Sequence, residues 1–428
     1  MTPLVQLAAR SAWHRRGTLA LVMLSIALAA FLLLTLERLR QDLRSGFAQA
    51  VSGTDLVVGA RTGPVQLMLY AVFRIGGATN NVSTASLQDV ERHRAVAWVV
   101  PLSLGDSHRG FPVMGTTPAY FERFRYGDRQ PLVLVQGRPH AGTLDGLYEA
   151  VIGAEVAERL DYGLGQRITL THGLPSAGAG ALAAEHADKP FTVVGVLART
   201  GTPVDRTVHV SLQAIQAIHL DWAGGAPMPG LAIPAEQARK FDLEPKQVTA
   251  ALVGLKSRAA VFAVQRWIAE YDKEPLLAVL PGVALDELWQ AVGLTEQALL
   301  AMSGIVALVS LAGLVSVVLA GLNERRRELA VLRAVGAAPR HVLVLLALEG
   351  ALVTLLGALA GLAASLVAVA AAAPWVQSRF GIALQPGMPS AGQWALFGLV
   401  LGAGMLASLV PATRAYRLSL ADGLSPRT

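Results

Sequence analysis

Four long stretches of the chain are almost free of charged residues. They cover residues 17–36, 297–323, 342–374 and 394–411, and the third is apolar apart from Glu349. A helix needs about 20 predominantly apolar residues to cross the ~30 Å hydrocarbon core of a bilayer. The pattern therefore predicts four transmembrane helices.

The first stretch also invites a second interpretation, a cleaved signal peptide. It follows Arg10, Arg15 and Arg16, and the sequence Ala48-Gln49-Ala50 resembles a cleavage site. Signal peptides have apolar runs of only about 7–15 residues, and here a charged segment, 37–44, lies before the cleavage-like sequence. A transmembrane helix is therefore the favoured interpretation.

Apolar residues continue at helical spacing beyond two of the stretches, on the sides that face each other along the chain. They are Leu39, Leu43, Phe47 and Val51 after the first stretch, and Leu285, Leu288, Trp289 and Val292 before the second. Gly53 is a natural end for the first helix. At 1.5 Å per residue, a helix over 285–322 would be about 57 Å long. Both helices are predicted to extend beyond the bilayer as a stalk.

The long segment between the stalk helices alternates short β-rich runs with helical patterns, which predicts an α+β domain. The β-rich runs are 55–58, 99–100, 167–170, 191–197 and 207–210, and the helical patterns are 86–93, 152–160 and 212–220. The Gly-rich segments 173–184 and 221–234 are predicted to be loops.

Composition supports a membrane protein. The chain is 53% hydrophobic and only 15% charged, whereas soluble domains carry about 25% charged residues. It has no cysteine, which excludes disulfides, thiolate catalysis and Cys-ligated metal. The formal net charge of +6 has a simple origin in cytoplasmic arginines.

Arginine placement predicts the orientation. The loop between the second and third stretches contains five arginines, whereas the next loop contains only Arg379. Cytoplasmic loops are enriched in Arg and Lys, so both termini and segment 323–341 are predicted to be cytoplasmic. The α+β segment then lies on the opposite side.

The resulting prediction is a membrane α-helical protein with a large external α+β domain on a helical stalk. The segments are a cytoplasmic N-terminus (1–16), transmembrane helix 1 (17–36), a stalk helix (37–52), the α+β domain (53–284), a stalk helix (285–296), transmembrane helix 2 (297–322), a cytoplasmic coupling helix and loop (323–341), transmembrane helix 3 (342–374), an external loop (375–393), transmembrane helix 4 (394–411) and a cytoplasmic tail (412–428).

No nucleotide-binding motif is present. The sequence contains no G-x-x-x-x-G-K-[ST], and its five lysines all lie in the external segment. A phosphate-binding loop needs that lysine next to the nucleotide. If ATP drives this protein, a separate subunit must bind it.

The cytoplasmic segment 323–341 predicts a short amphipathic helix. Its apolar face would contain Leu329, Leu332 and Val335, Gly336 would end it, and Pro339 would block its continuation. Such a helix is either an anchor on the lipid surface or a docking helix for a cytoplasmic partner, and the physical pattern favours neither.

The same segment resembles a family motif. Residues 324–352 are similar to E-R-R-R-E-[IL]-A-[VL]-L-R-A-[LV]-G-A followed by L-L-E-G, which is typical of MacB/FtsX-type ABC transporter permeases of the mechanotransmission class (type VII). Residues 411–418, P-A-T-R-A-Y-R-L, resemble the family's closing motif, and 191–205 resemble part of its external domain. The order of one span, a large domain and three spans also matches.

The resemblance implies a homodimeric permease of the bacterial inner membrane, with its large domain in the periplasm and no ATPase site, catalytic residue, metal or cofactor of its own. A separate cytoplasmic ATPase dimer would bind ATP, and an adaptor or substrate-binding partner is an expected periplasmic partner. ATPase coupling is expected from Glu324, Arg325, Arg326, Arg327, Glu328, Leu329, Leu332, Arg333, Val335 and Gly336.

Several kinds of work fit this architecture. The first is export of amphiphiles or peptides, or extraction of lipoproteins from the membrane. The alternative is a non-transporting transmitter that activates a periplasmic partner such as a cell-wall hydrolase. A membrane-bound enzyme is disfavoured because no catalytic constellation is recognisable. The chain lacks the fused ATPase domain of MacB itself, which weighs against macrolide efflux.

Some residues within the predicted spans point to helix packing. Glu349 matches a family position and is expected to pair with a neighbouring helix or to reach the membrane interface. The G-x-x-x-G pairs Gly357/Gly361 and Gly398/Gly402 would let helices approach closely.

Two external features remain open. The histidines there, His93, His108, His140, His172, His186, His209 and His219, form no H-x-H or H-E-x-x-H motif. Dispersed histidines are therefore favoured over a metal site. The apolar segment 64–73 is expected in the core, with an amphiphile-binding surface as the alternative.

Overall fold

A computed structural model describes residues 16–77, 80–173, 186–223, 226–228, 233–324, 336–380, 384 and 387–417. The chain divides into two compact units. The membrane unit comprises Met1–Asp42, Val292–Trp375 and Leu384–Thr428, and the external unit comprises Leu43–Ala291 and Val376–Ala383.

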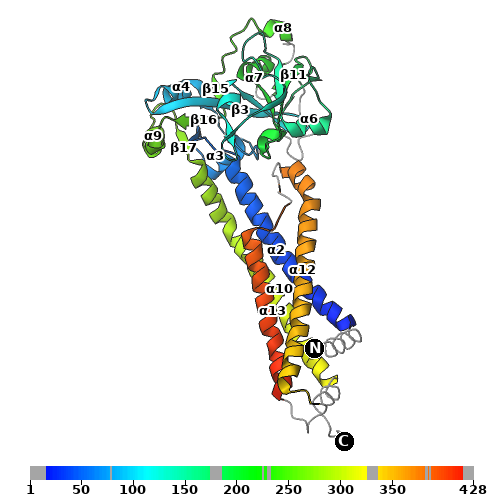
Figure 1. Cartoon of the computed structure of the whole chain (residues 1–428). Helices are drawn as coiled ribbons and strands as arrows, with labels where there is room; N and C mark the ends of the chain where they lie inside the picture. The colour runs from blue at the N-terminus through cyan, green and yellow to red at the C-terminus, as the bar shows by residue number, and fades with distance from the viewer. Residues whose placement is uncertain are drawn as a thin grey trace. The chain divides into compact units, whose positions relative to one another are not determined.

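Four of the described helices are long and apolar enough to cross a membrane, which confirms the predicted number. They are α2 (Arg16–Gln49), α10 (Pro281–Glu324), α12 (Pro339–Phe380) and α13 (Ala391–Arg417), labelled in Figure 1. The boundary between the units falls inside α2 and α10, and both helices are continuous through it. At 44 residues, α10 is about 66 Å long.

The membrane unit has a small apolar core to which all four helices contribute. It contains Ile26 and Leu34 of α2, Leu314 of α10, Ala358 of α12 and Phe397 of α13. Two helices run further than the apolar stretches indicated, because α12 continues through Pro374 and α13 through Pro411. Proline is tolerated in membrane helices where neighbouring groups satisfy the freed carbonyl.

The external unit is built around a mixed eleven-stranded sheet in the order β17-β1-β16-β3-β4-β12-β8-β11-β7, with β10 paired to β3 and β9 to β11. The β12–β4 and β11–β8 pairs are parallel, and the other pairs of this sheet are antiparallel. This mixture of strands and helices confirms the predicted α+β class.

The elements of the external unit have the following bounds. The strands are β1 (Leu56–Ala60), β2 (Val82–Ser83), β3 (Val96–His108), β4 (Phe111–Thr116), β5 (Arg125–Tyr126), β6 (Gln130–Pro131), β7 (Leu134–Gly137), β8 (Glu149–Ile152), β9 (Arg167–Ile168), β10 (Thr171–His172), β11 (Phe191–Leu197), β12 (Val208–Ser211), β13 (Trp222–Ala223), β14 (Ala226–Pro227), β15 (Gln247–Val248), β16 (Ala250–Leu255) and β17 (Leu276–Val279). The helices are α3 (Pro64–Ala71), α4 (Thr84–Arg92), α5 (Ala119–Arg123), α6 (Ala154–Leu160), α7 (Leu212–Ile218), α8 (Ala235–Ala238) and α9 (Val261–Ala269), with 3₁₀ turns η1 (Pro203–Arg206) and η2 (Arg258–Ala260).

Both faces of the sheet are covered, because successive side chains of a strand point to opposite faces. In β16, Leu252 joins a core with α3, whereas Val253 joins a second core with α4 and α9. In β8, Val151 faces the first core and Ile152 a third core with α6 and α7. Most of the predicted loop 173–184 lies outside the described residues.

Within the external unit, the last turn of α2 and the first turns of α10 pack together. The Phe47 ring lies 5.7 Å from the Trp289 ring and 4.4 Å from that of Phe73. Leu285 is buried in the same core. The apolar positions that predicted the stalk helices therefore contact the domain core at this end.

Candidate functional site

The predicted coupling segment begins where α10 ends, at Glu324. Its further residues Arg325, Arg326, Arg327, Glu328, Leu329, Leu332, Arg333 and Val335 lie outside the described residues. The description resumes at Gly336, whose φ of 104° lies in a region that glycine adopts without steric cost.

Pro339 has a role beyond the one that the sequence predicts. The sequence predicts that it stops the preceding helix, and it also forms the first residue of α12. Proline is well suited to that position, because its fixed φ matches the helix and its missing N–H would have no intrahelical acceptor.

One of the two glycine pairs lies where two helices approach closely. A Cβ atom added to Gly357 would lie 2.9 Å from the carbonyl oxygen of Met23, and one added to Gly361 would lie 2.5 Å from that of Ala27. Both glycines therefore bring α12 against the backbone of α2. A Cβ at Gly398 or Gly402 would meet nothing within 4 Å among the described residues.

Glu349 lies half-buried on α12, about three turns from its start. Its neighbour Gly350 packs against Ser408 of α13, and Gly404 of α13 packs against Thr354 of α12. Small residues thus line the α12–α13 contact, as is common where membrane helices meet without large side chains between them.

A buried polar cluster near the outer end of the membrane unit joins α2 to the start of α13. The Arg38 guanidinium donates to the Asp42 carboxylate at 3.1 Å and to the Met388 carbonyl at 2.9 Å. The Gln393 amide donates to the Leu34 carbonyl at 3.0 Å, and its oxygen accepts from Arg38 at 3.3 Å. Gln393 is 1% exposed, so these bonds fix the 387–393 turn on α2.

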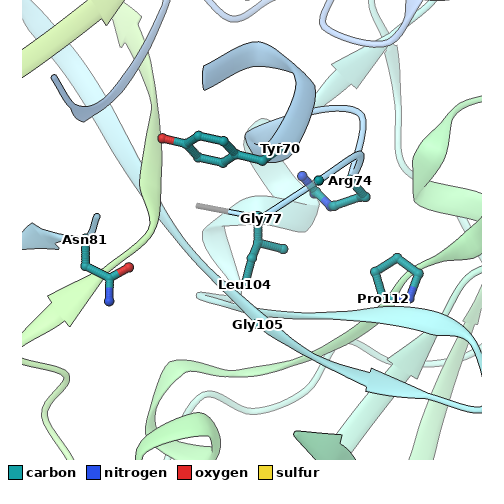
Figure 2. A pocket seen from close by; sticks show the side chains of 8 residues that line it. Tyr70, Arg74, Gly77, Asn81, Leu104, Gly105 and Pro112 are labelled. Atoms are coloured by element: carbon teal, nitrogen blue, oxygen red, sulfur yellow. The ribbon is translucent and has the colours of Figure 1, made fainter. Parts of the chain in front are cut away.

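The external unit contains a cavity of about 340 Å³. Figure 2 shows Tyr70 and Arg74, from α3 and the turn after it, facing Leu104 and Pro112 of the β3–β4 hairpin, with Asn81 to one side. The apolar segment 64–73 therefore has two roles. Leu67 belongs to the domain core, as predicted, whereas Tyr70 also lines this cavity.

Arg74 gives the cavity its chemical character. Its guanidinium donates to the Ala71 carbonyl and contacts the Met114 sulfur at 2.7 Å. It forms no ion pair with any described residue, and its Nε has no hydrogen-bond partner there. Burial lowers the pKa of Arg74, yet guanidinium stays charged in proteins. A cation without a counter-ion beside a cavity favours a ligand with an anionic group.

The Tyr70 hydroxyl is also buried without a hydrogen-bond partner among the described residues. Burial raises the pKa of Tyr70, so the hydroxyl stays protonated and can donate. The cavity therefore offers an apolar wall and one cation, a combination that suits an amphiphile with an anionic head group.

The histidines are less dispersed than the sequence suggested. His172, His186 and His219 gather around Asp106, and the ligand atoms of these four residues lie within 4.8 Å of one another. His140 and His209 instead pack against the Phe121 ring. The four residues of the first group come from separate elements with no fixed spacing, so no local motif marked them.

Two protein-family models match the chain. The FtsX-like permease C-terminal model matches residues 300–420, and the MacB-like periplasmic core domain model matches residues 18–271. No curated protein matches the chain.

Two solved structures are similar to the external part. The periplasmic region of MacB from Actinobacillus actinomycetemcomitans aligns over 57% of this chain and 94% of its own length, at 12% identity and a TM-score of 0.33. The extracellular domain of the noncanonic ABC-type transporter YknZ from Gram-positive bacteria aligns over 52% of this chain and 98% of its own length, at 13% identity and a TM-score of 0.29.

The periplasmic-domain model alone covers more than half of the chain, and the permease model covers α12, α13 and the second half of α10. The chain is a membrane protein with a periplasmic domain, and it belongs to the MacB/FtsX-type family of ABC transporter permeases.

Proposed function

We propose that this chain is an inner-membrane permease subunit that transmits ATP-driven movement from a separate cytoplasmic ATPase dimer to its periplasmic domain. The main observation that supports this proposal is that α2 and α10 are continuous helices, each with residues in both the membrane unit and the external unit. A movement of either helix at its cytoplasmic end is thereby transmitted along its length. The absence of a P-loop in the sequence supports a separate ATPase.

The coupling contact is assigned to 324–336. Its predicted apolar face, Leu329, Leu332 and Val335, would fill a groove on the ATPase, and each buried side chain contributes about 1.5–3 kcal/mol. Surface ion pairs of its arginines contribute only about 0–1 kcal/mol each. Binding strength should therefore depend mainly on the apolar face.

The periplasmic work is assigned to amphiphiles, either exported or, as lipoproteins, extracted from the membrane. The cavity supports this choice over pure signal transmission, because it combines an apolar wall with the Arg74 guanidinium, which has no ion pair among the described residues. A homodimer is part of the proposal. The open faces at Gly398 and Gly402 are available for close packing between two copies.

The test is the substitution Leu329→Asp, with Arg325→Ala as the matched control. We expect Leu329→Asp to abolish co-purification of the ATPase and its activity in the complex, because a charge in an apolar contact loses its solvation. Membrane insertion should be normal. Arg325→Ala should weaken the complex by less than about fivefold.

If Leu329→Asp leaves the complex and its activity intact, the segment is a membrane-surface anchor and the coupling proposal fails. The purified chain by itself should show no ATP hydrolysis above a mock preparation. Turnover by the isolated chain would overturn the assignment of ATP binding to a separate subunit.

A further inference from the structure

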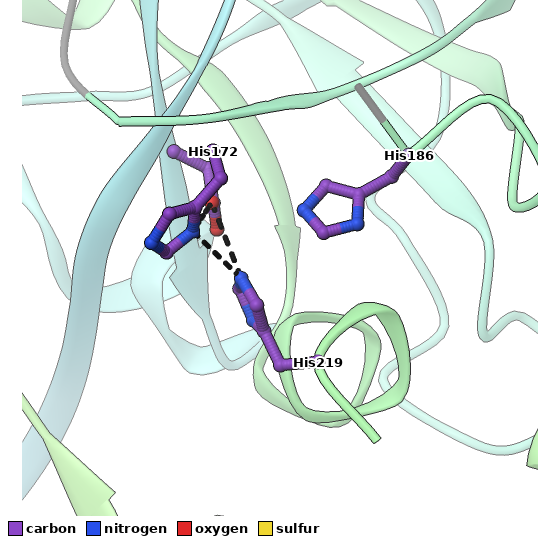
Figure 3. Close-up of side chains that lie close together, drawn as sticks. His172, His186 and His219 are labelled. Carbon is purple, nitrogen blue, oxygen red and sulfur yellow. Dashed lines mark hydrogen bonds and ion pairs between the residues drawn. The ribbon is translucent and has the colours of Figure 1, made fainter. Parts of the chain in front are cut away.

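Four side chains from distant parts of the sequence meet in the external unit. Asp106 is near the end of β3, and His172 is its register partner on β10. His219 follows the last residue of α7, and His186 precedes β11. Figure 3 shows the three imidazoles turned toward a common centre.

The distances between three of the ligand atoms are those of a metal coordination shell. His172 Nδ1 lies 2.9 Å from His219 Nε2 and 3.1 Å from Asp106 Oδ1, and His219 Nε2 lies 3.5 Å from the same oxygen. Zinc bonds of about 2.0–2.1 Å in a tetrahedron place neighbouring ligand atoms about 3.3 Å apart. The three observed distances between ligand atoms lie on both sides of this 3.3 Å value.

His186 provides an independent observation. It is 1% exposed, and neither of its ring nitrogens has a hydrogen-bond partner among the described residues. A buried imidazole without partners is costly, because both polar atoms lose water and gain nothing in return. A metal ion at the centre of the cluster would satisfy one nitrogen, and the ring is close enough to supply a fourth ligand.

The tautomer of His219 is set by its own helix. Its Nδ1 lies 2.8 Å from the Ile215 carbonyl oxygen. Because a carbonyl oxygen can only accept a hydrogen bond, Nδ1 carries the proton. Nε2 is therefore the atom that faces the cluster. Metal-binding histidines commonly donate their other N–H to a carbonyl, which fixes the ring orientation.

Asp106 supplies the negative charge. It is 3% exposed, and its Oδ1 lies 3.1 Å from His172 Nδ1 and 3.5 Å from His219 Nε2. The buried Lys189 ammonium is paired with other carboxylates, because it lies 2.9 Å from that of Asp221 and 2.8 Å from that of Asp188. Lys189 therefore does not balance the negative charge of Asp106, and a bound cation would do so.

One aromatic ring packs against the cluster. The Trp222 ring lies 4.3 Å from the ring of His186 and 5.1 Å from that of His172. The hydrophobic groups around a metal site influence its properties as part of the outer shell.

From this geometry we propose that Asp106, His172, His186 and His219 bind one divalent transition-metal ion of the zinc class. Three imidazoles and one carboxylate suit Zn²⁺ and its neighbours, whereas Mg²⁺ and Ca²⁺ prefer oxygen ligands. With four protein ligands the shell is closed, which is typical of structural rather than catalytic zinc.

The site would connect β3, β10 and the end of α7 to His186, five residues before β11. Its ligands His172 and His186 stand on either side of residues 174–185, so metal binding ties the two ends of that segment together. Periplasmic metal would then stabilise one arrangement of the external unit. This inference concerns the external unit alone and stands whether or not the coupling proposal is correct.

The test uses the full-length chain in detergent, with a tag free of histidine, stripped of metal by a chelator. Zn²⁺ is titrated in competition with a chromophoric chelator, and bound metal is counted by mass spectrometry. We expect one Zn²⁺ per chain. Co²⁺ in its place should give the intense visible absorption of a tetrahedral site.

Two ligand variants and one control complete the test. His186→Asn and His172→Asn should each weaken Zn²⁺ binding at least about tenfold and abolish the Co²⁺ spectrum. The His172 side chain is 35% exposed, so this variant is expected to fold even if His186→Asn does not. His93→Asn, at the end of α4 and outside the cluster, should bind as the original chain does.

Absence of stoichiometric binding by the original chain would overturn the proposal. So would a folded His172→Asn chain with unchanged affinity and an unchanged Co²⁺ spectrum. Neither outcome affects ATPase association, so a failure here is distinguishable from a failure of the proposed function.

Discussion

The external and membrane units bury their apolar surface in different ways. The external unit encloses three cores with many side chains at 0% exposure, among them Val57, Val151 and Val253. In the most apolar windows of the four membrane helices, only 22–39% of residues are buried within one chain. The external unit has its own core, whereas most of the apolar surface of the membrane helices must be covered by lipid or by other protein.

The contacts differ in kind as well. The external cores contain rings and branched side chains, such as Tyr120 stacked on Phe124 at 5.0 Å. The membrane unit brings backbones together through Gly357, Gly361 and Gly404. In water large apolar side chains stabilise a fold by leaving solvent. In lipid that driving force is absent, so close packing of small residues stabilises the contact instead.

The sharpest test of the division between the units is topology, where the expected effect is all or none. The chain has no native cysteine, so single cysteines can be introduced as Ala179→Cys in the external segment and Ala337→Cys in the segment predicted to be cytoplasmic. An impermeant thiol reagent applied to spheroplasts should label the first and leave the second unlabelled. Labelling of Ala337→Cys alone would invert the orientation derived from the arginines.

The next largest effect is expected from Gly361→Leu. A side chain there would overlap the backbone of α2 at the Ala27 carbonyl oxygen and the Phe31 nitrogen, and overpacking of this kind costs about 3 kcal/mol or more when backbone must move. We expect a large loss of thermal stability in detergent. Gly402→Leu is the matched control, because its Cβ would meet open space in one chain.

The outcome of Gly402→Leu sharpens the comparison. Unchanged thermal stability with a loss of dimer in size-exclusion chromatography would place Gly402 between two copies. If Gly361→Leu is as stable as the original chain, the close approach of α12 to α2 does not hold.

Acid should destabilise the external unit through buried histidines. Burial lowers the pKa of His209 to about 3 and that of His140 to about 4, whereas the unfolded value is about 6.5. A lowered pKa means that the unfolded chain binds the proton more readily. The contribution of these histidines to the free energy of unfolding is therefore fully present above about pH 6.5 and decreases as the pH falls toward 3. At pH 5 the loss is about 2 kcal/mol per histidine.

The measurement is the thermal transition of the detergent-solubilised full chain at pH 7.5 and pH 5. His209→Gln keeps a donor for the Val151 carbonyl, which lies 3.2 Å from His209 Nδ1, and removes the titration. This variant should lose less stability between the two pH values than the original chain. An equal loss in both would exclude His209 as a source of acid sensitivity.

The smallest effect is expected in the polar cluster of the membrane unit. Gln393→Leu removes the hydrogen bonds that Gln393 forms with the Leu34 carbonyl and the Arg38 guanidinium, which costs about 1–2 kcal/mol for buried groups. Thermal stability in detergent should fall modestly. Thr413→Ala, which removes an exposed hydroxyl bonded within its own helix, should have no measurable effect.

Local patterns were sufficient for much of the architecture. The length of the apolar stretches predicts four membrane helices, and the spacing of Phe47 and Trp289 predicts helices that continue beyond the bilayer. Alternating short elements predict an α+β domain. Each depends on residues close together in the sequence, where helical and strand periodicities act directly.

Other features became visible only with the tertiary structure. Asp106 and His219 are far apart in the sequence, and sheet register and helix packing bring them to 3.5 Å. Among the described residues, Arg74 beside a cavity has no ion pair, and Gly361 contacts a neighbouring helix whereas Gly402 does not. Both features likewise depend on which elements pack together. Periodicity indicates which face of an element is apolar. It does not specify which partner covers that face, because partner choice depends on the complementary shape and charge of distant segments.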